Sequence, residues 1–167
     1  MKKFVAGLVL GLLIFPLAGY LYVASGSAPT ATADPPLPGE VYMAKMALRA
    51  RLRDARSLKS PIAANEASFV AGAKIYKDNC AGCHGLPNQP VGNIARGMFP
   101  YPPQLFHGEE MVTDDPVGTI YWKAANGIRL TGMPAFKQSL NDAQLWQVSL
   151  LLAHADKLPP AAQDLLK

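Results

Sequence analysis

The chain has 167 residues, of which 50% are hydrophobic and 17% are charged, and its formal net charge is +4. This length provides one domain with additional segments, the apolar fraction excludes a disordered chain, and the charge content excludes a protein with many membrane spans. The charge is uneven, because residues 1–60 contain eight Lys and Arg against three acidic residues and residues 61–167 contain eight against nine. The basic character therefore belongs to the front of the chain.

The first segment is an apolar run preceded by Lys2 and Lys3. Residues 4–24 contain no charged side chain and would span about 31 Å as a helix, close to the hydrocarbon thickness of a bilayer. The run is longer than the apolar part of an ordinary signal peptide, and it ends near Tyr20 and Tyr22, which suit the membrane interface. These features predict a retained transmembrane anchor.

Other features of the same segment favour a signal peptide that is removed after export. Pro16 would kink a helix, and the small residues at 24–26 and 31–33 are suitable for cleavage. Residues 1–25 are therefore predicted to be an anchor, with a cleaved signal as the alternative. In both cases the positive-inside rule places the rest of the chain outside a bacterial inner membrane, facing the periplasm.

A linker and a basic segment follow. Residues 26–40 are rich in Pro and Ala and predict an extended tether. Residues 41–57 predict a helix with an apolar stripe beside a basic stripe, which could lie on an anionic membrane, on an acidic protein or on its own domain. The two stripes are Val41, Ala44, Leu48, Leu52 and Ala55, and Lys45, Arg49, Arg53 and Arg56.

Three further helices are predicted from periodicity and capping signals, at about 66–80, 116–126 and 142–158. Residues 85–113 contain five prolines and four glycines, and they predict a loop wrapped around something other than a conventional core. No strand pattern is visible. The predicted fold class is all-α with long loops.

The chemistry of the chain is concentrated in Cys80-Ala81-Gly82-Cys83-His84, which contains both cysteines. Cys-x-x-Cys-His is the attachment motif of c-type haem, in which each thiol forms a thioether and the His is the proximal iron ligand. A thioredoxin-like pair would need a strand leading into it, and a zinc site would need His107 and His154, which lie far away. We therefore predict one haem c, bound covalently through Cys80 and Cys83.

The sixth iron ligand decides between electron transfer and catalysis. Met133 is the favoured candidate, because it lies in Gly132-Met133-Pro134, where the proline stiffens the loop. Met98 is the second choice. The Met and His residues that follow the attachment motif are Met98, His107, Met111, Met133 and His154.

Residues 66–158 resemble the class I c-type cytochromes, the single-haem electron carriers of bacteria and mitochondria. Gly72-x-x-x-Tyr76-x-x-x-Cys80 matches the family's N-terminal helix, which crosses a C-terminal helix where Trp146 stands. Residues 126–136 look like the family's distal loop, which contains Met133. The resemblance implies the class I cytochrome c fold, with few helices and long loops around one covalent haem.

The resemblance also implies contacts around the iron ligands. Pro103, in Pro103-Gln104-Leu105, would accept a hydrogen bond from His84, with Pro87, Pro90 and Pro102 as alternatives. Leu105 would then pack on the haem.

Two further haem contacts are predicted from residue type. Trp122, beside Tyr121, is expected near the haem edge, with an ordinary core position as the alternative. Arg129 is expected to meet a haem propionate, with a solvent-exposed position as the alternative.

The expected function is one-electron transfer by a tethered, periplasm-facing cytochrome c, a carrier and not an enzyme. Expected partners are a membrane oxidoreductase, an oxidase or a reaction centre of a respiratory or photosynthetic assembly, of which the chain could be a subunit, and no nucleic acid. The alternatives are a haem sensor or catalytic subunit in which Met133 dissociates, and an assembly subunit that depends on its basic helix.

The expected organisation is an anchor or signal (1–25), a linker (26–40), a basic helix (41–60), a cytochrome c domain (61–160) and a tail (161–167).

Overall fold

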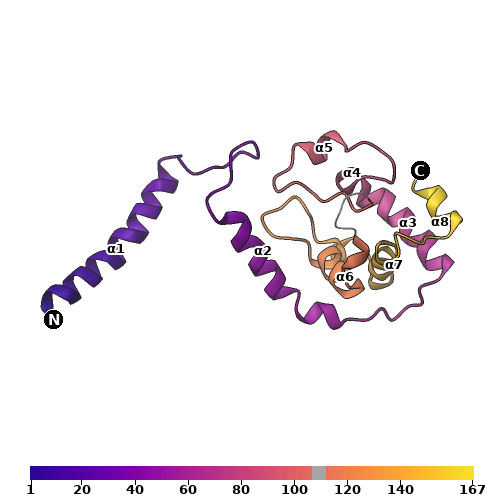
Figure 1. Ribbon diagram of the computed structural model, residues 1–167, viewed down its shortest axis with the longest axis horizontal. Coiled ribbons are helices and arrows are strands. Elements are labelled where there is room, and N and C mark those ends of the chain that lie inside the picture. Colours follow the sequence, from indigo (N-terminus) through magenta and orange to yellow (C-terminus); the bar gives the residue numbers. More distant parts are fainter. Residues whose placement is uncertain (107–111) are drawn as a thin grey trace. The chain divides into compact units, whose positions relative to one another are not determined.

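The computed structural model describes residues 1–106 and 112–167, so His107 and Met111 lie outside the described residues. In these two ranges the regular elements are helical and none is a strand, which confirms the predicted all-α class (Figure 1). The chain divides into two compact units, Met1–Val41 and Tyr42–Lys167.

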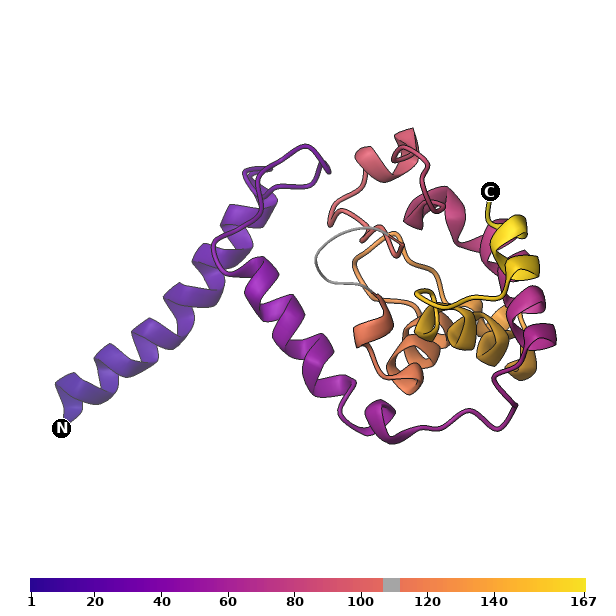
Figure 2. The same cartoon turned by 45° about the vertical axis from the view of Figure 1, so that its right-hand side comes forward.

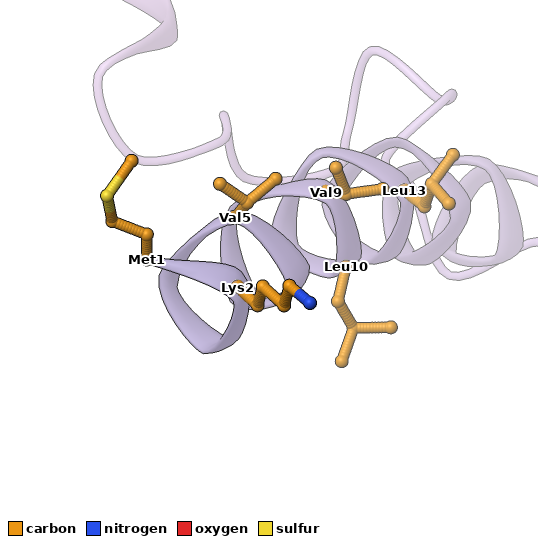
Figure 3. A pocket seen from close by; sticks show the side chains of 6 residues that line it. All are labelled: Met1, Lys2, Val5, Val9, Leu10 and Leu13. Carbon is orange, nitrogen blue, oxygen red and sulfur yellow. The ribbon is translucent and has the colours of Figure 1, made fainter.

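The first unit contains α1 (Lys2–Ala24), which has the length and apolar composition needed to cross a membrane. Its large side chains are exposed, with Phe15 at 83%, and Pro16 lies inside the helix without ending it. The hollow drawn in Figure 3 is lined by side chains of α1 and the preceding Met1, so it belongs to the surface of one exposed helix. An anchor and a signal sequence share these properties.

The second unit is built from α-helices of 4 to 14 residues and short 3-10 helices, joined by long loops. A helix that begins just before the unit, α2 (Glu40–Arg51), leads into it. The remaining elements are η1 (Asp54–Ser57), α3 (Glu66–Asn79), α4 (Ala81–His84), α5 (Asn93–Arg96), η2 (Val112–Asp114), α6 (Val117–Asn126), η3 (Phe136–Gln138), α7 (Asp142–Ala153) and α8 (Pro160–Leu165).

The core of this unit is the crossing of α3 and α7. The Asn65 side chain caps α3 by accepting from the Ser68 N–H at 2.9 Å, and Asn141 forms a capping box with Gln144 at the start of α7. At the crossing, Gly72 lies against the backbone carbonyl of Gln147. A side chain at position 72 would push the two helices apart, which explains the glycine.

The end of the chain differs from the sequence prediction. The last long helix ends at Ala153, before the predicted stop at Pro159, and α8 follows from Pro160 into the predicted tail. Figures 1 and 2 show α8 beside α3, and Ala162 and Leu166 are fully buried. Lys77 Nζ donates to the Leu165 carbonyl oxygen at 3.1 Å. Because α8 is only six residues long, its stability depends on this packing more than on local propensity.

The basic segment also differs, because the single helix predicted over 41–57 is interrupted. α2 ends at Arg51, and after two residues the chain continues as η1. After the interruption, the side chains of Leu52 and Ala55 are buried in the core. The short helix η1 packs on α6, where Gly118 lies against Ala55 and Leu58.

Replacing Gly72 tests the helix crossing. A methyl group in Gly72→Ala would collide with the Gln147 carbonyl, so we expect the free energy of unfolding to fall by about 1–3 kcal/mol. Gly82→Ala in α4 is the control, because its methyl group would point into open space. Denaturant unfolding measures both variants, and equal stability of the two would contradict the close approach.

Candidate haem-binding site

The cysteine motif forms one helical turn at the end of α3. The Cys80 N–H donates to the Tyr76 carbonyl at 2.8 Å, and the His84 N–H donates to the Cys80 carbonyl at 2.9 Å. Cys80 and Cys83 are both half-buried free thiols on this turn. The motif therefore presents two thiols and one imidazole from a single short element.

The His84 ring is fixed by a hydrogen bond to the chain opposite. Nδ1 lies 2.8 Å from the Pro103 carbonyl oxygen, and because a carbonyl only accepts, Nδ1 is the donor. The lone pair of the neutral ring is then on Nε2. Burial lowers the pKa of His84, against an opposing effect of the Pro103 bond, so the neutral form that binds metal is favoured.

The segment after Pro102 is joined to the motif at two more points. Gln104 Nε2 donates to the Cys83 carbonyl at 3.1 Å and to the Pro102 carbonyl at 3.2 Å. The Leu105 N–H donates to the His84 carbonyl at 3.3 Å. Together with the His84–Pro103 bond, these contacts form what we call the proline clamp, residues 102–105. Gln104 carries no recognised sequence signal for this role.

Two residues behind the motif support the clamp. Gly85 has φ +74°, and its missing side chain leaves room for Gln104 Oε1. The buried Tyr76 hydroxyl donates to the Gly85 carbonyl at 2.7 Å, and burial raises its pKa. The sequence pattern points to Tyr76 as a helix-crossing aromatic but does not reveal the role of its hydroxyl.

The environment of Cys80 disfavours its thiolate. Burial, with a smaller effect of Cys83, raises the pKa of the Cys80 thiol to about 12. A redox-active or zinc-bound cysteine needs the thiolate, which positive surroundings stabilise. Within residues 1–106 and 112–167, no group of three His, Cys, Asp or Glu side chains is arranged to hold a metal ion. Both competing interpretations of the cysteine pair lose support.

Met133 lies in a loop closed by its own hydrogen bonds. The Ile128 N–H donates to the Met133 carbonyl at 3.2 Å, and the Met133 N–H donates to Thr131 Oγ1 at 3.1 Å. The Met133 backbone is thus fixed between α6 and η3, on a segment separate from His84, and its side chain is half-buried.

The other ligand candidates are placed differently. The Met98 side chain touches Gly132, the residue before Met133, so the two methionine segments meet. His154 lies at the end of α7, where Nδ1 donates to the Leu150 carbonyl at 2.9 Å and the ring contacts Phe69. His107 and Met111 fall outside the described residues.

The remaining expected haem contacts lie in three places. Leu105 is half-buried and packs against the core cluster. Trp122, on α6, has the Arg51 guanidinium 5.7 Å from its ring centroid, so it contacts the end of α2. Arg129 is exposed in the Met133 loop. The haem contacts of all three stay predictions.

Comparison with known proteins shows to which protein family the chain belongs. The model of the cytochrome c oxidase, cbb3-type, subunit III family matches residues 67–150, which is half of the chain and includes the cysteine motif and Met133. The chain belongs to this c-type cytochrome family. Membership implies a covalently bound haem c, and the motif of this cytochrome has the required spacing. It also indicates electron transfer with redox protein partners.

Other comparisons add little detail. One chain of the reducing HAO-like protein complex of Kuenenia stuttgartiensis is similar to the cytochrome, at 25% sequence identity and a TM-score of 0.48. The match covers 58% of the cytochrome and 46% of that chain, so it spans less than half of the length of that relative. No curated protein matches.

The described residues fit haem c by the chemistry of their donors. Two thiols on one turn suit addition to the two vinyl groups of a haem. The His84 imidazole donates through Nδ1 to Pro103, which leaves Nε2 available for iron. Cys80, Cys83, His84 and Met133 are the residues that would hold the group. The bound haem supplies a one-electron couple.

Replacing Gly85 tests the proline clamp. Gly85→Ala forces an alanine into a positive φ and against Gln104, so we expect a loss of about 1–3 kcal/mol in the free energy of unfolding. Gly97→Ala is the matched control, because Gly97 also follows a short helix but has φ −92° and only ordinary contacts. A clamp without structural importance would leave both variants equally stable.

Proposed function

We propose that this cytochrome transfers one electron at a time through a haem whose iron is bound by His84 and Met133. The observation that carries the proposal is the 2.8 Å bond from His84 Nδ1 to the Pro103 carbonyl. Such a bond fixes the ring and strengthens its donation to a metal. A residue held in this way suits a permanent ligand.

The loop geometry supports Met133 as the second axial ligand. Its backbone is closed on itself by the Ile128 and Thr131 hydrogen bonds, so the side chain starts from a fixed position. His/Met ligation raises the reduction potential, and two protein ligands leave no coordination position for a substrate. The proposed protein is therefore a carrier or an electron-transfer subunit and not itself a catalyst.

The proposed location is the periplasmic face of an inner membrane, with α1 retained as the anchor. The support is the length and apolar character of α1 and the two lysines that precede its apolar run. A tether raises the effective concentration of the haem domain near membrane complexes. The family description names an oxidase subunit, which supports a respiratory oxidase as the partner, either as an electron acceptor or as the assembly to which the cytochrome belongs.

Replacing Met133 tests the axial ligation. Oxidised Met133→Ala should lose the sulfur-to-iron charge-transfer band, and its reduction potential should fall by on the order of 0.1 V, within the roughly 0.8 V that axial ligands span. Met98→Ala, which alters the neighbouring methionine, should keep the band. Loss of the band in Met98→Ala alone would assign the ligand to Met98. Ready carbon monoxide binding by the reduced wild type would indicate a sensor or catalytic subunit.

The intact mass of the protein extracted from membranes tests the anchor. We expect the full 17.9 kDa chain plus one haem, because a retained α1 keeps the protein in the membrane fraction. The soluble fraction serves as the control. A haem protein found there, with a chain that begins at about residue 25, would show that α1 is removed as a signal.

A further inference from the structure

The helix α2 carries two apolar stripes, and the fold uses only one of them. The first stripe continues into the core, with Leu48 half-buried and Leu52 buried. The second stripe contains Tyr42, Met43 and Met46, whose exposed fractions are 69%, 56% and 46%. At about 100° per residue, Met46 lies roughly 160° around the helix from Leu48. The second stripe therefore faces away from the core side of the helix.

The charges of α2 favour an anionic partner for this outer side. Lys45 and Arg49 are four residues apart, so they lie on one face beside the second stripe. Among the described residues, none of the ion pairs includes either of them. Glu40 is the one acidic residue of α2, and it accepts the Leu37 N–H at 2.8 Å in the helix's first turn. The outer side therefore combines apolar and positive side chains.

The end of α2 is fixed to the haem domain, so the second stripe cannot simply rotate inward. Arg51 lies over the Trp122 ring of α6, and the following Ala55 and Leu58 lie against Gly118. These contacts hold Leu52 and Ala55 in the core. An apolar stripe that always faces outward indicates a binding partner other than the domain itself.

The length of the linker limits how far α2 can lie from the membrane that holds α1. Residues 25–39 separate α1 from α2, and even fully extended they reach no more than about 54 Å. This step rests on the proposed retention of α1 as an anchor. With that anchor, α2 remains close to a bilayer surface at high effective concentration.

We propose that the outer face of α2, formed by Tyr42, Lys45, Met46 and Arg49, lies on the surface of an anionic bilayer. The basic side chains would meet the negative headgroups, and the Tyr and Met side chains would enter the boundary between headgroups and acyl chains. A lipid surface fits better than an acidic protein, because Tyr favours the membrane interface and the tether keeps lipid always within reach. The contact would orient the haem domain relative to the membrane.

Hydrogen exchange of the full-length haem-loaded protein tests this proposal. The protein is placed in nanodiscs of phosphatidylcholine alone or mixed with phosphatidylglycerol, and exchange is measured peptide by peptide. We expect α2 amides to exchange about tenfold more slowly in the anionic discs, with α7 unchanged. Lys45→Glu/Arg49→Glu should abolish the slowing. Lys74→Glu/Lys157→Glu is the control, with the same charge change at exposed positions of the haem domain.

Equal exchange of α2 in the two kinds of disc would overturn the proposal, as would slowing that requires an added acidic protein. The anchor is tested separately in the same samples, because α1 peptides are protected in both discs only if α1 is inserted. The sulfur-to-iron charge-transfer band of each sample reports on His84 and Met133 independently of either helix. Failure of the lipid contact, of the anchor and of the haem ligation can therefore be distinguished.

Discussion

The hydrogen bond from His84 Nδ1 to the Pro103 carbonyl joins two segments that are 19 residues apart and fixes the orientation of the imidazole. Gln104 and Leu105 add bonds to the Cys83 and His84 carbonyls, so the backbone of the motif is held as well as its side chain. Since the clamp is made by backbone carbonyls and one amide side chain, it carries no net charge into the site. A neutral, rigid surrounding suits a centre that gains and loses one electron.

The helices determine where this clamp acts. The Cys80 turn continues α3, and α3 is set against α7 by the contact at Gly72. The helix α8 packs on α3, and Ala162 and the following Leu166 are buried in the same core cluster. On α6, the Tyr121 ring stacks on Trp146 of α7, with 4.0 Å between the ring centroids. The Tyr121 hydroxyl donates a hydrogen bond to the Asp142 carboxylate at 2.5 Å. That bond raises the pKa of Tyr121 to about 12. The crossing thus supports both the cysteine turn and the loop that follows α6.

Local signals made much of this structure predictable. Asn141 and Gly127 bound their helices as capping rules expect, and the Cys-x-x-Cys-His spacing indicates haem without reference to the fold. The remaining features depend on contacts between distant residues. Leu52 and Ala55 interrupt the basic helix because α6 offers them a core, and α8 is stable only beside α3. Likewise, Gln104 reaches Cys83, and Met98 reaches Gly132, only after the loops are in place.

A crystal structure of the haem-loaded protein would show which atoms bind the iron. We expect thioether bonds to Cys80 and Cys83, His84 Nε2 and Met133 Sδ on opposite sides of the iron, and a hydrogen bond from His84 Nδ1 to the Pro103 carbonyl. An iron bound by another residue in place of Met133, or by a water molecule, would contradict it. So would a His84 ring turned away from Pro103.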